Sequence, residues 1–405
     1  MSGAAQVVGG IEQHRQDVAP VGKSQTRSPL NFSRRIPELD GFRGVAVSLA
    51  LLFHYGRYAM VARPPALLGY LYTTTPLLWS GMEMFFVLSG FLIGGILLDA
   101  RDSPRYFSTF YVRRLCRIMP VYFLFLGVVG IAYLLVYRPV GAPLDWVFAG
   151  KIPWYAYLTF TQNFWMAKQS NIGAVILLIT WSLAVEEQFY LLLPVIVRFV
   201  RRSALPYVFM AGIALAPLVR LYIVHRWYLS GLLATYVLLP CRMDSLFLGA
   251  LFAYLLRKPG AWAWLSKRHT EMWMVFFGLI LVMPALNNAG IPFTLLWMAI
   301  GVGWMSLFFA IVLTLTLMDS ENFISRILRV KWLARLGEIG LNVYLFHLAI
   351  YCFCMWLLTG HKWALASWKD FAVTLLALAV TLAFGRLSWR YFEKPIMRWG
   401  HTWQY

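Results

Sequence analysis

The sequence predicts an all-α polytopic membrane protein of about ten transmembrane helices with both termini in the cytoplasm. Of the 405 residues, 60% are hydrophobic and only 13% are charged, whereas typical globular domains carry about 25% charged residues. The mean hydropathy is +0.65. Apolar runs recur along most of the chain, many of them near the roughly 20 residues that a helix needs to cross a bilayer. These observations exclude a soluble enzyme, a disordered chain and a disulfide scaffold.

The apolar runs divide the chain into three parts. Residues 1–36 are polar and irregular, with no apolar core long enough for a signal peptide, and we expect a disordered cytoplasmic tail. Residues 37–395 form the membrane domain, and residues 396–405 form a short cytoplasmic tail. The predicted spans are 42–62, 77–98, 118–137, 182–199, 206–226, 240–256, 272–290, 294–318, 339–359 and 371–391. Residues 139–180 are too polar for a confident span, and we expect an outer loop with one or two interfacial or re-entrant helices.

The distribution of positive charge predicts the orientation. The formal net charge is +19, which in a soluble chain would indicate nucleic acid but in a membrane protein indicates cytoplasmic loops rich in Lys and Arg. With ten spans and the N-terminus inside, 26 of the 36 Lys and Arg residues fall on the cytoplasmic side. We therefore expect a multi-pass protein of the cell inner membrane that binds no nucleic acid. The four cysteines have no zinc-site spacing, so no metal is expected.

Ionisable residues inside predicted spans are the candidates for function, because burying them in lipid is costly. Arg43 lies at the cytoplasmic edge of the first span, and His54 follows eleven residues later, near the middle of the bilayer. Arg43 could be an anchor that reaches the interface, and His54 could serve interhelical hydrogen bonding. An intramembrane imidazole is also suited to general base catalysis.

A cluster of arginines precedes the third predicted span. Arg114 and Arg117 are three residues apart in the stretch 113–120 (RRLCRIMP), so they share one helix face. The common use of such a cluster is cytoplasmic charge. The alternative is a clamp for a phosphate-bearing ligand, because guanidinium groups bind phosphate through several hydrogen bonds.

The fourth predicted span opens with carboxylates. Ser182, Glu186 and Tyr190 recur every four residues and therefore line one stripe of the helix. Glu187 points to a different face, so Glu186 is the stronger functional candidate. His347, in the middle of the ninth span, is a second intramembrane imidazole.

Two further polar groups have simpler explanations. Arg242 and Asp244 begin the sixth span and could form an ion pair with each other. Glu83 precedes Ser89 and Gly90, two small residues that favour close helix packing. Nucleotide-binding Gly-rich loops, zinc-protease motifs and the serine-hydrolase elbow are absent from the sequence.

Five motifs, taken in order, resemble the acyltransferase 3 family of integral membrane acyltransferases. The resemblance covers about residues 37–395. The motifs are 37–44 (PELDGFRG) with His54, 85–93 (FFVLSGFLI), 113–120 (RRLCRIMP), 181–190 (WSLAVEEQFY) and 242–246 (RMDSL). One stretch departs from the expected pattern, because residues 342–347 read NVYLFH where a Ser-Tyr pair is common.

The resemblance implies transfer of an acyl group, often acetyl, from cytoplasmic acyl-CoA to a hydroxyl of a carbohydrate, a surface polysaccharide or a glycoside. By position, His54 matches the essential histidine and Glu186 the acidic residue of the fourth motif. Arg43 matches the partner arginine of the histidine, and Arg114 and Arg117 match the pair that holds CoA. Acyl-CoA would be the donor substrate, with no permanently bound cofactor, and the partners would be the bilayer and the acceptor.

Two other classes of function are compatible with the residues. In a proton-coupled transporter or flippase, His54 and Glu186 would form a proton relay. In a membrane scaffold, all these charges would be structural. For catalysis, His54 could act as a base or as a transient acyl carrier.

Overall fold

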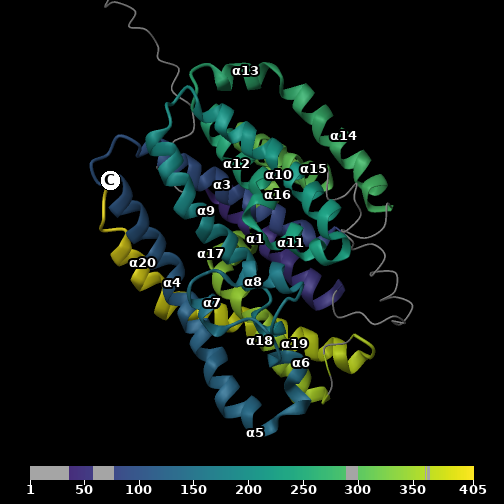
Figure 1. Cartoon of the computed structure of the whole chain (residues 1–405). Coiled ribbons are helices and arrows are strands. Elements are labelled where there is room, and N and C mark those ends of the chain that lie inside the picture. The colour runs from purple at the N-terminus through teal and green to yellow at the C-terminus, as the bar shows by residue number, and fades with distance from the viewer. Residues whose placement is uncertain (1–35, 58–76, 289–299, 361, 363–364) are drawn as a thin grey trace, which may run out of the picture.

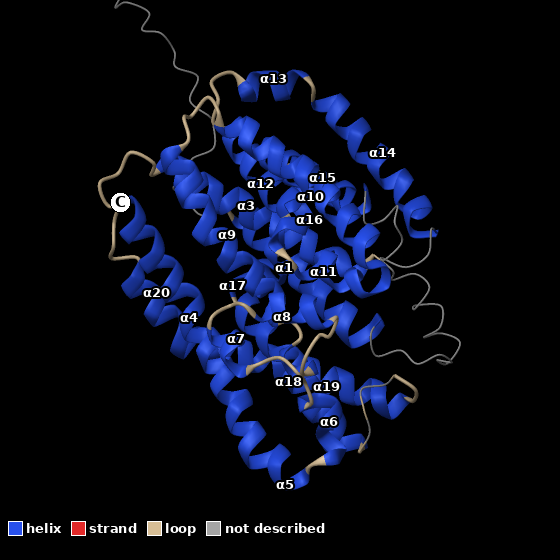
Figure 2. Ribbon diagram, viewed as in Figure 1, coloured by secondary structure: helices blue, strands red, loops and turns tan. Residues whose placement is uncertain are grey.

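The computed structural model describes residues 36–57, 77–288, 300–360, 362 and 365–405 (Figure 1). Within these residues every regular element is a helix, and no strand is present (Figure 2). The predicted tail, apart from its last residue, and parts of the first, seventh and eighth predicted spans lie outside the described residues. The all-α prediction is confirmed.

The α-helices are numbered in chain order. Their bounds are α1 Pro37–Leu52, α3 Gly81–Asp99, α4 Tyr106–Ala132, α5 Arg138–Val140, α6 Asp145–Phe148, α7 Trp154–Leu158, α8 Gln162–Gln169, α9 Thr180–Phe199, α10 Leu205–Trp227, α11 Leu232–Val237, α12 Met243–Leu255, α13 Ala261–Lys267, α14 His269–Asn288, α15 Val302–Met318, α16 Phe323–Leu328, α17 Lys331–Glu338, α18 Gly340–Thr359, α19 Trp368–Ser388 and α20 Lys394–Gly400. A π-helical segment, Trp389–Glu393, joins α19 to α20.

Six helical stretches in the described part of the chain are long and apolar enough to cross a membrane. They are Leu78–Asp99, Tyr106–Val140, Val175–Phe199, Leu205–Trp227, Gly340–Thr359 and Trp368–Gly400. Three shorter helices, Met243–Leu255, His269–Val282 and Val302–Met318, are also apolar. Each of the ten predicted segments contains a helix, and the protein has the character of a membrane protein.

The helix α4 begins earlier than the sequence suggested. We expected the third span to start at residue 118, but the helix starts at Tyr106, after a turn that contains Pro104. The apolar run marks only the part of a helix that contacts lipid, whereas backbone hydrogen bonds continue past it. Arg114 and Arg117 therefore lie within a rigid helix and not in a loop.

The region 139–180 contains several short helices. We expected one or two, and α6, α7 and α8 are present, none of them long enough to span a bilayer. Their apolar side chains pack into the main core, where Val147, Ala156 and Met166 are buried. Of the aromatic residues in this region, Phe148 and Tyr157 are buried, whereas Trp154 and Tyr155 are exposed.

Close contacts between glycines and facing backbone hold α1 and α3 in place. A Cβ on Gly90 of α3 would lie 1.9 Å from the carbonyl oxygen of Leu246 on α12. On α1, a Cβ on Gly44 would lie 2.1 Å from the carbonyl oxygen of Leu333 on α17. Only glycine permits such approaches in tightly packed membrane helices. The prediction that Gly90 serves close packing is confirmed. The backbones of α1 and α3 are therefore in direct contact with those of α17 and α12.

Candidate active site

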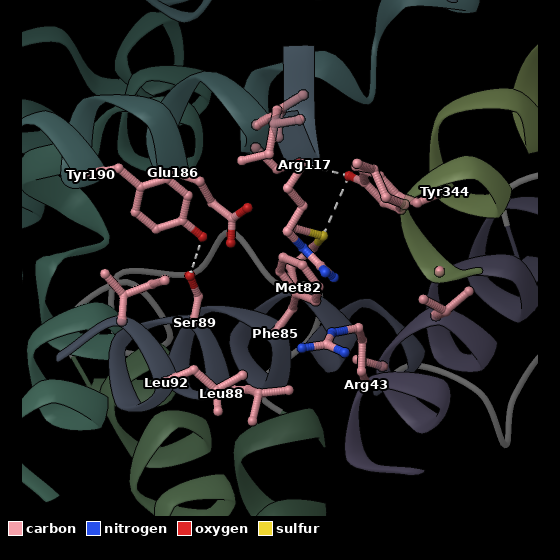
Figure 3. Close-up of a pocket in the computed structure, with 18 of the residues that line it drawn as sticks. Arg43, Met82, Phe85, Leu88, Ser89, Leu92, Arg117, Glu186, Tyr190 and Tyr344 are labelled. Atoms are coloured by element: carbon pink, nitrogen blue, oxygen red, sulfur yellow. Dashed lines mark hydrogen bonds between the residues drawn. The ribbon is translucent and has the colours of Figure 1, made fainter. Parts of the chain in front are cut away.

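A cavity of about 170 Å³ lies between α1, α3, α4, α9 and α18 (Figure 3). Four of the five predicted site residues line it: Arg43, Arg114, Arg117 and Glu186. They come from three helices that are far apart in the sequence. Most of the other residues that line the cavity are apolar. The charged groups therefore lie in a mainly apolar surrounding.

The arginines give this cavity a positive wall. Arg43 pairs with Asp40, one turn earlier on α1, at 3.2 Å. Arg114 lies 5.9 Å from the ring of Tyr190, and Arg117 lies 3.9 Å from the sulfur of Met397. Among the described residues, neither Arg114 nor Arg117 forms an ion pair with a carboxylate. Two guanidinium groups are thus left available for an anionic ligand.

The C-terminal residues lie beside α4, close to its arginines. Thr109 donates a hydrogen bond to the carbonyl oxygen of Gln404, and Arg113 donates one to that of Trp403. His401 follows the last span. Burial lowers the pKa of its imidazole, and the positive charges of Arg113, Arg117 and Arg114 lower this pKa further. The predicted tail 396–405 is therefore packed along α4, near the arginines.

A second polar part of the cavity lining comes from α3 and α9. The hydroxyl groups of Ser89 and Tyr190 are hydrogen-bonded at 2.6 Å. Glu186 is 4% exposed, and among the described residues its Oε1 has no hydrogen-bond partner. Ser182, Glu186 and Tyr190 all line the cavity, in agreement with the predicted stripe. Because burying an unpaired carboxylate oxygen is costly, this atom is placed to accept a hydrogen bond from a ligand.

His54 lies in a second, smaller cavity next to the first. This cavity has a volume of about 20 Å³, and it shares Ala50, Met82 and Tyr344 with the larger one. The hydroxyl of Tyr344 is 2.8 Å from that of Ser182 and 3.5 Å from the sulfur of Met82 (Figure 3). Met82 and Tyr344 therefore form a thin partition between the arginine-lined cavity and the histidine.

His54 forms a pair with His347, which is fully buried on α18. The Nδ1 of His347 lies 2.6 Å from the carbonyl oxygen of Tyr344, so this nitrogen must carry a proton. Its Nε2 lies 3.1 Å from the Nδ1 of His54 and accepts a hydrogen bond from it. The same Nδ1 of His54 is 2.9 Å from the carbonyl oxygen of Ala50. In neutral His54, these contacts place the proton on Nδ1 and leave Nε2 as the basic nitrogen.

Two buried ion pairs involve Arg242 and Asp244. The simple explanation offered by the sequence, that Arg242 and Asp244 could pair with each other, is wrong. Arg242 pairs with Glu83, and Asp244 pairs with Arg220 at 2.7 Å. Residues 242 and 244 are two apart, so their side chains diverge and meet partners on different helices.

Arg242 also supports the aromatic lining of the small cavity. The guanidinium group of Arg242 lies 4.5 Å from the ring of Tyr236 and 5.9 Å from that of Trp181. Both rings line the cavity that contains His54.

Sequence reasoning missed several residues of this region. Met82 and Tyr344, which form the partition, lie within apolar motifs and show no signal in the sequence. Glu393 is buried, accepts a hydrogen bond from Asn342 and lies within electrostatic range of Arg117 and Arg43. The rule that singled out His54 selects ionisable residues inside predicted spans, so it does not reach Asn342, which is not ionisable, or Glu393, which lies just beyond the last predicted span.

The fold and the site together define a polytopic membrane protein in which an arginine-lined cavity adjoins a buried histidine pair. The sequence model of the acyltransferase 3 family, described as an acyltransferase domain, matches residues 36–390. The chain belongs to this family of integral membrane proteins.

Curated relatives match most of the chain. The protein named "Putative O-acetyltransferase SACOL0978" of Staphylococcus aureus strain COL is 25% identical over 392 residues. O-acetyltransferase OatA of S. aureus strain NCTC 8325 is 24% identical over 384 residues. Both alignments cover 91% of this chain and 58% of the relative, so the chain spans less than two thirds of their length. No solved structure matches the chain.

Proposed function

We propose that the protein is a membrane O-acyltransferase that moves an acyl group, acetyl in the first instance, from cytoplasmic acyl-CoA to a hydroxyl of a carbohydrate or glycoside. The observation that carries this proposal is the adjacency of the two cavities. They share Ala50, Met82 and Tyr344, so that a donor held by the arginines could reach His54 with its thioester. Family membership and the names of the relatives support the same reaction class.

In this proposal, Arg43, Arg114 and Arg117 bind the phosphates of the donor and the acyl-thioester arm passes the Met82–Tyr344 partition. Glu186 accepts a hydrogen bond from the bound substrate through Oε1, the oxygen that has no hydrogen-bond partner within the described part of the chain. The small cavity beside His54, about 20 Å³, favours a short acyl group such as acetyl.

The chemical step is direct transfer with His54 as general base. Its Nε2 takes the proton of the acceptor hydroxyl as the oxygen attacks the thioester carbonyl, because a neutral hydroxyl attacks a thioester poorly. The C–S bond then breaks, and the imidazolium returns the proton to the thiolate, releasing CoA with a free thiol. His347 keeps the Nδ1 of His54 protonated, so that Nε2 is the nitrogen facing the reaction.

The enzyme assay tests this function directly. Purified protein in detergent should release CoA from acetyl-CoA and transfer the acetyl group to a sugar hydroxyl, measured by thiol release and by mass spectrometry of the acceptor. No acyl-CoA turnover, with gradient-driven uptake of a solute in vesicles, would contradict the proposal and indicate a carrier. Glycan mass spectra from a deletion strain, compared with the parent, should lack one acyl mass.

We further propose ten spans in the cell inner membrane with both termini cytoplasmic, which is supported by the distribution of positive charge. Reporter fusions after residue 20 and after residue 405 should be active only with a reporter that works in the cytoplasm. Activity of either fusion with an external reporter would contradict this topology. Termini on opposite sides would mean that the number of spans is odd, so that one of the ten predicted segments does not cross the membrane.

A further inference from the structure

A larger groove lies apart from the candidate active site. It has a volume of about 860 Å³ and lies between α1, α17 and the continuous helix that runs from α19 into α20. Ser48, Leu51 and Leu52 of α1 line it, whereas Val47 and Ala50 line the catalytic cavity. No residue that the structure describes lines both spaces. The groove is therefore a separate feature on another face of the same helix.

The apolar part of the groove comes from the interiors of two predicted spans. Leu51 and Leu52 belong to the first span, and Leu378 and Leu382 belong to the last. These side chains are suited to contact with hydrocarbon chains.

The basic part of the groove comes from the end of the last predicted span, which holds Arg386 and Arg390, and from residues just outside the predicted spans. Arg335, Arg386, Arg390 and Lys394 line it, and Glu338 is the single carboxylate among the described residues of the lining. Among the described residues, none of these four cations forms an ion pair with Asp or Glu. Four positive charges against one negative charge leave a net positive site. Two tryptophans, Trp332 and Trp389, complete the lining, and tryptophan is enriched at the membrane interface.

We propose that this groove binds an anionic glycerophospholipid of the bilayer. The phosphate lies among Arg386, Arg390 and Lys394, and the acyl chains lie along the leucines. Basic pockets between membrane helices on the cytoplasmic side are suited to anionic headgroups, and guanidinium groups form charge-assisted hydrogen bonds with phosphate. A zwitterionic lipid carries a cationic group that the four positive charges disfavour.

Lipid in this groove would also support the catalytic site. A Cβ on Gly337 of α17 would lie 1.9 Å from the carbonyl oxygen of Asp40 on α1, so the two helices are in direct backbone contact. The helix α1 carries Arg43, and His54 follows it directly. A lipid that bridges α17 and α19 holds α1 against the cavity. This effect on turnover rests on the proposed function, whereas lipid binding does not.

Native mass spectrometry tests the binding. Protein released from vesicles of phosphatidylcholine mixed with phosphatidylglycerol should retain phosphatidylglycerol. The double variant Arg386→Gln/Arg390→Gln should retain it roughly thirtyfold more weakly, because each basic residue near a membrane surface contributes about a fivefold factor. The control, Arg105→Gln/Arg201→Gln, removes the same charge from exposed positions outside the groove. It should retain the lipid like the unmodified protein.

The experiment distinguishes an anionic lipid in the groove from acetyl-CoA. Equal retention by the groove variant and the control would overturn the proposal. A groove variant that raises the KM for acetyl-CoA in phosphatidylcholine alone would assign the groove to the donor and would also overturn it. Phosphatidylglycerol should raise the melting temperature of the unmodified protein and of the control, but not of the groove variant. This readout holds even if the protein turns over no acyl-CoA.

Discussion

Replacing His54 by Gln is expected to abolish acyl transfer while leaving expression and acetyl-CoA binding nearly intact. Gln can form the hydrogen bond to Ala50 and occupy the same space, but it cannot accept and release a proton at neutral pH. General base catalysis contributes typically 10²- to 10⁴-fold, so kcat should fall by about that factor. Activity of the unmodified protein should fall as the pH is lowered and the imidazole gains a proton. A Gln variant with near-normal turnover would refute the assignment and direct attention to Glu186 or His347.

Two substitutions of His347, the histidine that contacts His54, test its role in positioning the His54 ring. His347→Phe removes the acceptor of the bond from Nδ1 of His54 and should lower kcat without changing the KM for acetyl-CoA. His347→Gln restores a carbonyl acceptor and should recover part of the loss. A residue that serves only packing would instead change expression and melting temperature, and Phe, the more apolar replacement, would be the better tolerated of the two. Equal kcat in both variants and the unmodified protein would remove His347 from the mechanism.

Removing either arginine of the pair on α4 is expected to weaken use of the donor. Arg114→Ala or Arg117→Ala should raise the KM for acetyl-CoA with little change in kcat, because a phosphate contact is made equally in the ground and transition states. The loss of one charge-assisted hydrogen bond costs about 1.5–3 kcal/mol of binding free energy. This corresponds to a roughly ten- to hundredfold rise in the KM for acetyl-CoA. Arg→Lys should recover only part, since the planar fork is lost. Folding should be little affected, because neither arginine has a carboxylate partner within ion-pair distance among the described residues.

The neighbouring arginine supplies the control for this experiment. Arg113 lies on the same helix, but it donates a hydrogen bond to the carbonyl oxygen of Trp403 and does not line the cavity. Arg113→Ala removes the same charge and should leave the affinity for acetyl-CoA unchanged. Isothermal titration with CoA measures all three variants. Full CoA affinity in Arg114→Ala or Arg117→Ala, with normal insertion, would refute the phosphate clamp.

The sequence by itself determined the class of protein and most of the candidate residues. Transfer of a side chain into lipid has a free energy that depends mainly on that side chain and its depth. Apolar runs and misplaced charges can therefore be recognised without knowing any neighbour. Glu186 stood out for this reason, whereas Arg43, Arg114 and Arg117 stood out at the cytoplasmic ends of predicted spans. The structure places all four around one cavity.

Only the tertiary structure decided which groups meet. His54 contacts His347 across 293 residues, Arg242 pairs with Glu83 and not with Asp244, and Tyr344 stands between the two cavities. Membrane helices are often apolar on every side, so periodicity does not reveal which face packs inward or against which partner. Those contacts depend on close approaches such as that of Gly90 to Leu246, which join segments distant in the chain. The lipid environment can be recognised from each residue alone, but the geometry of the site depends on how the helices pack together.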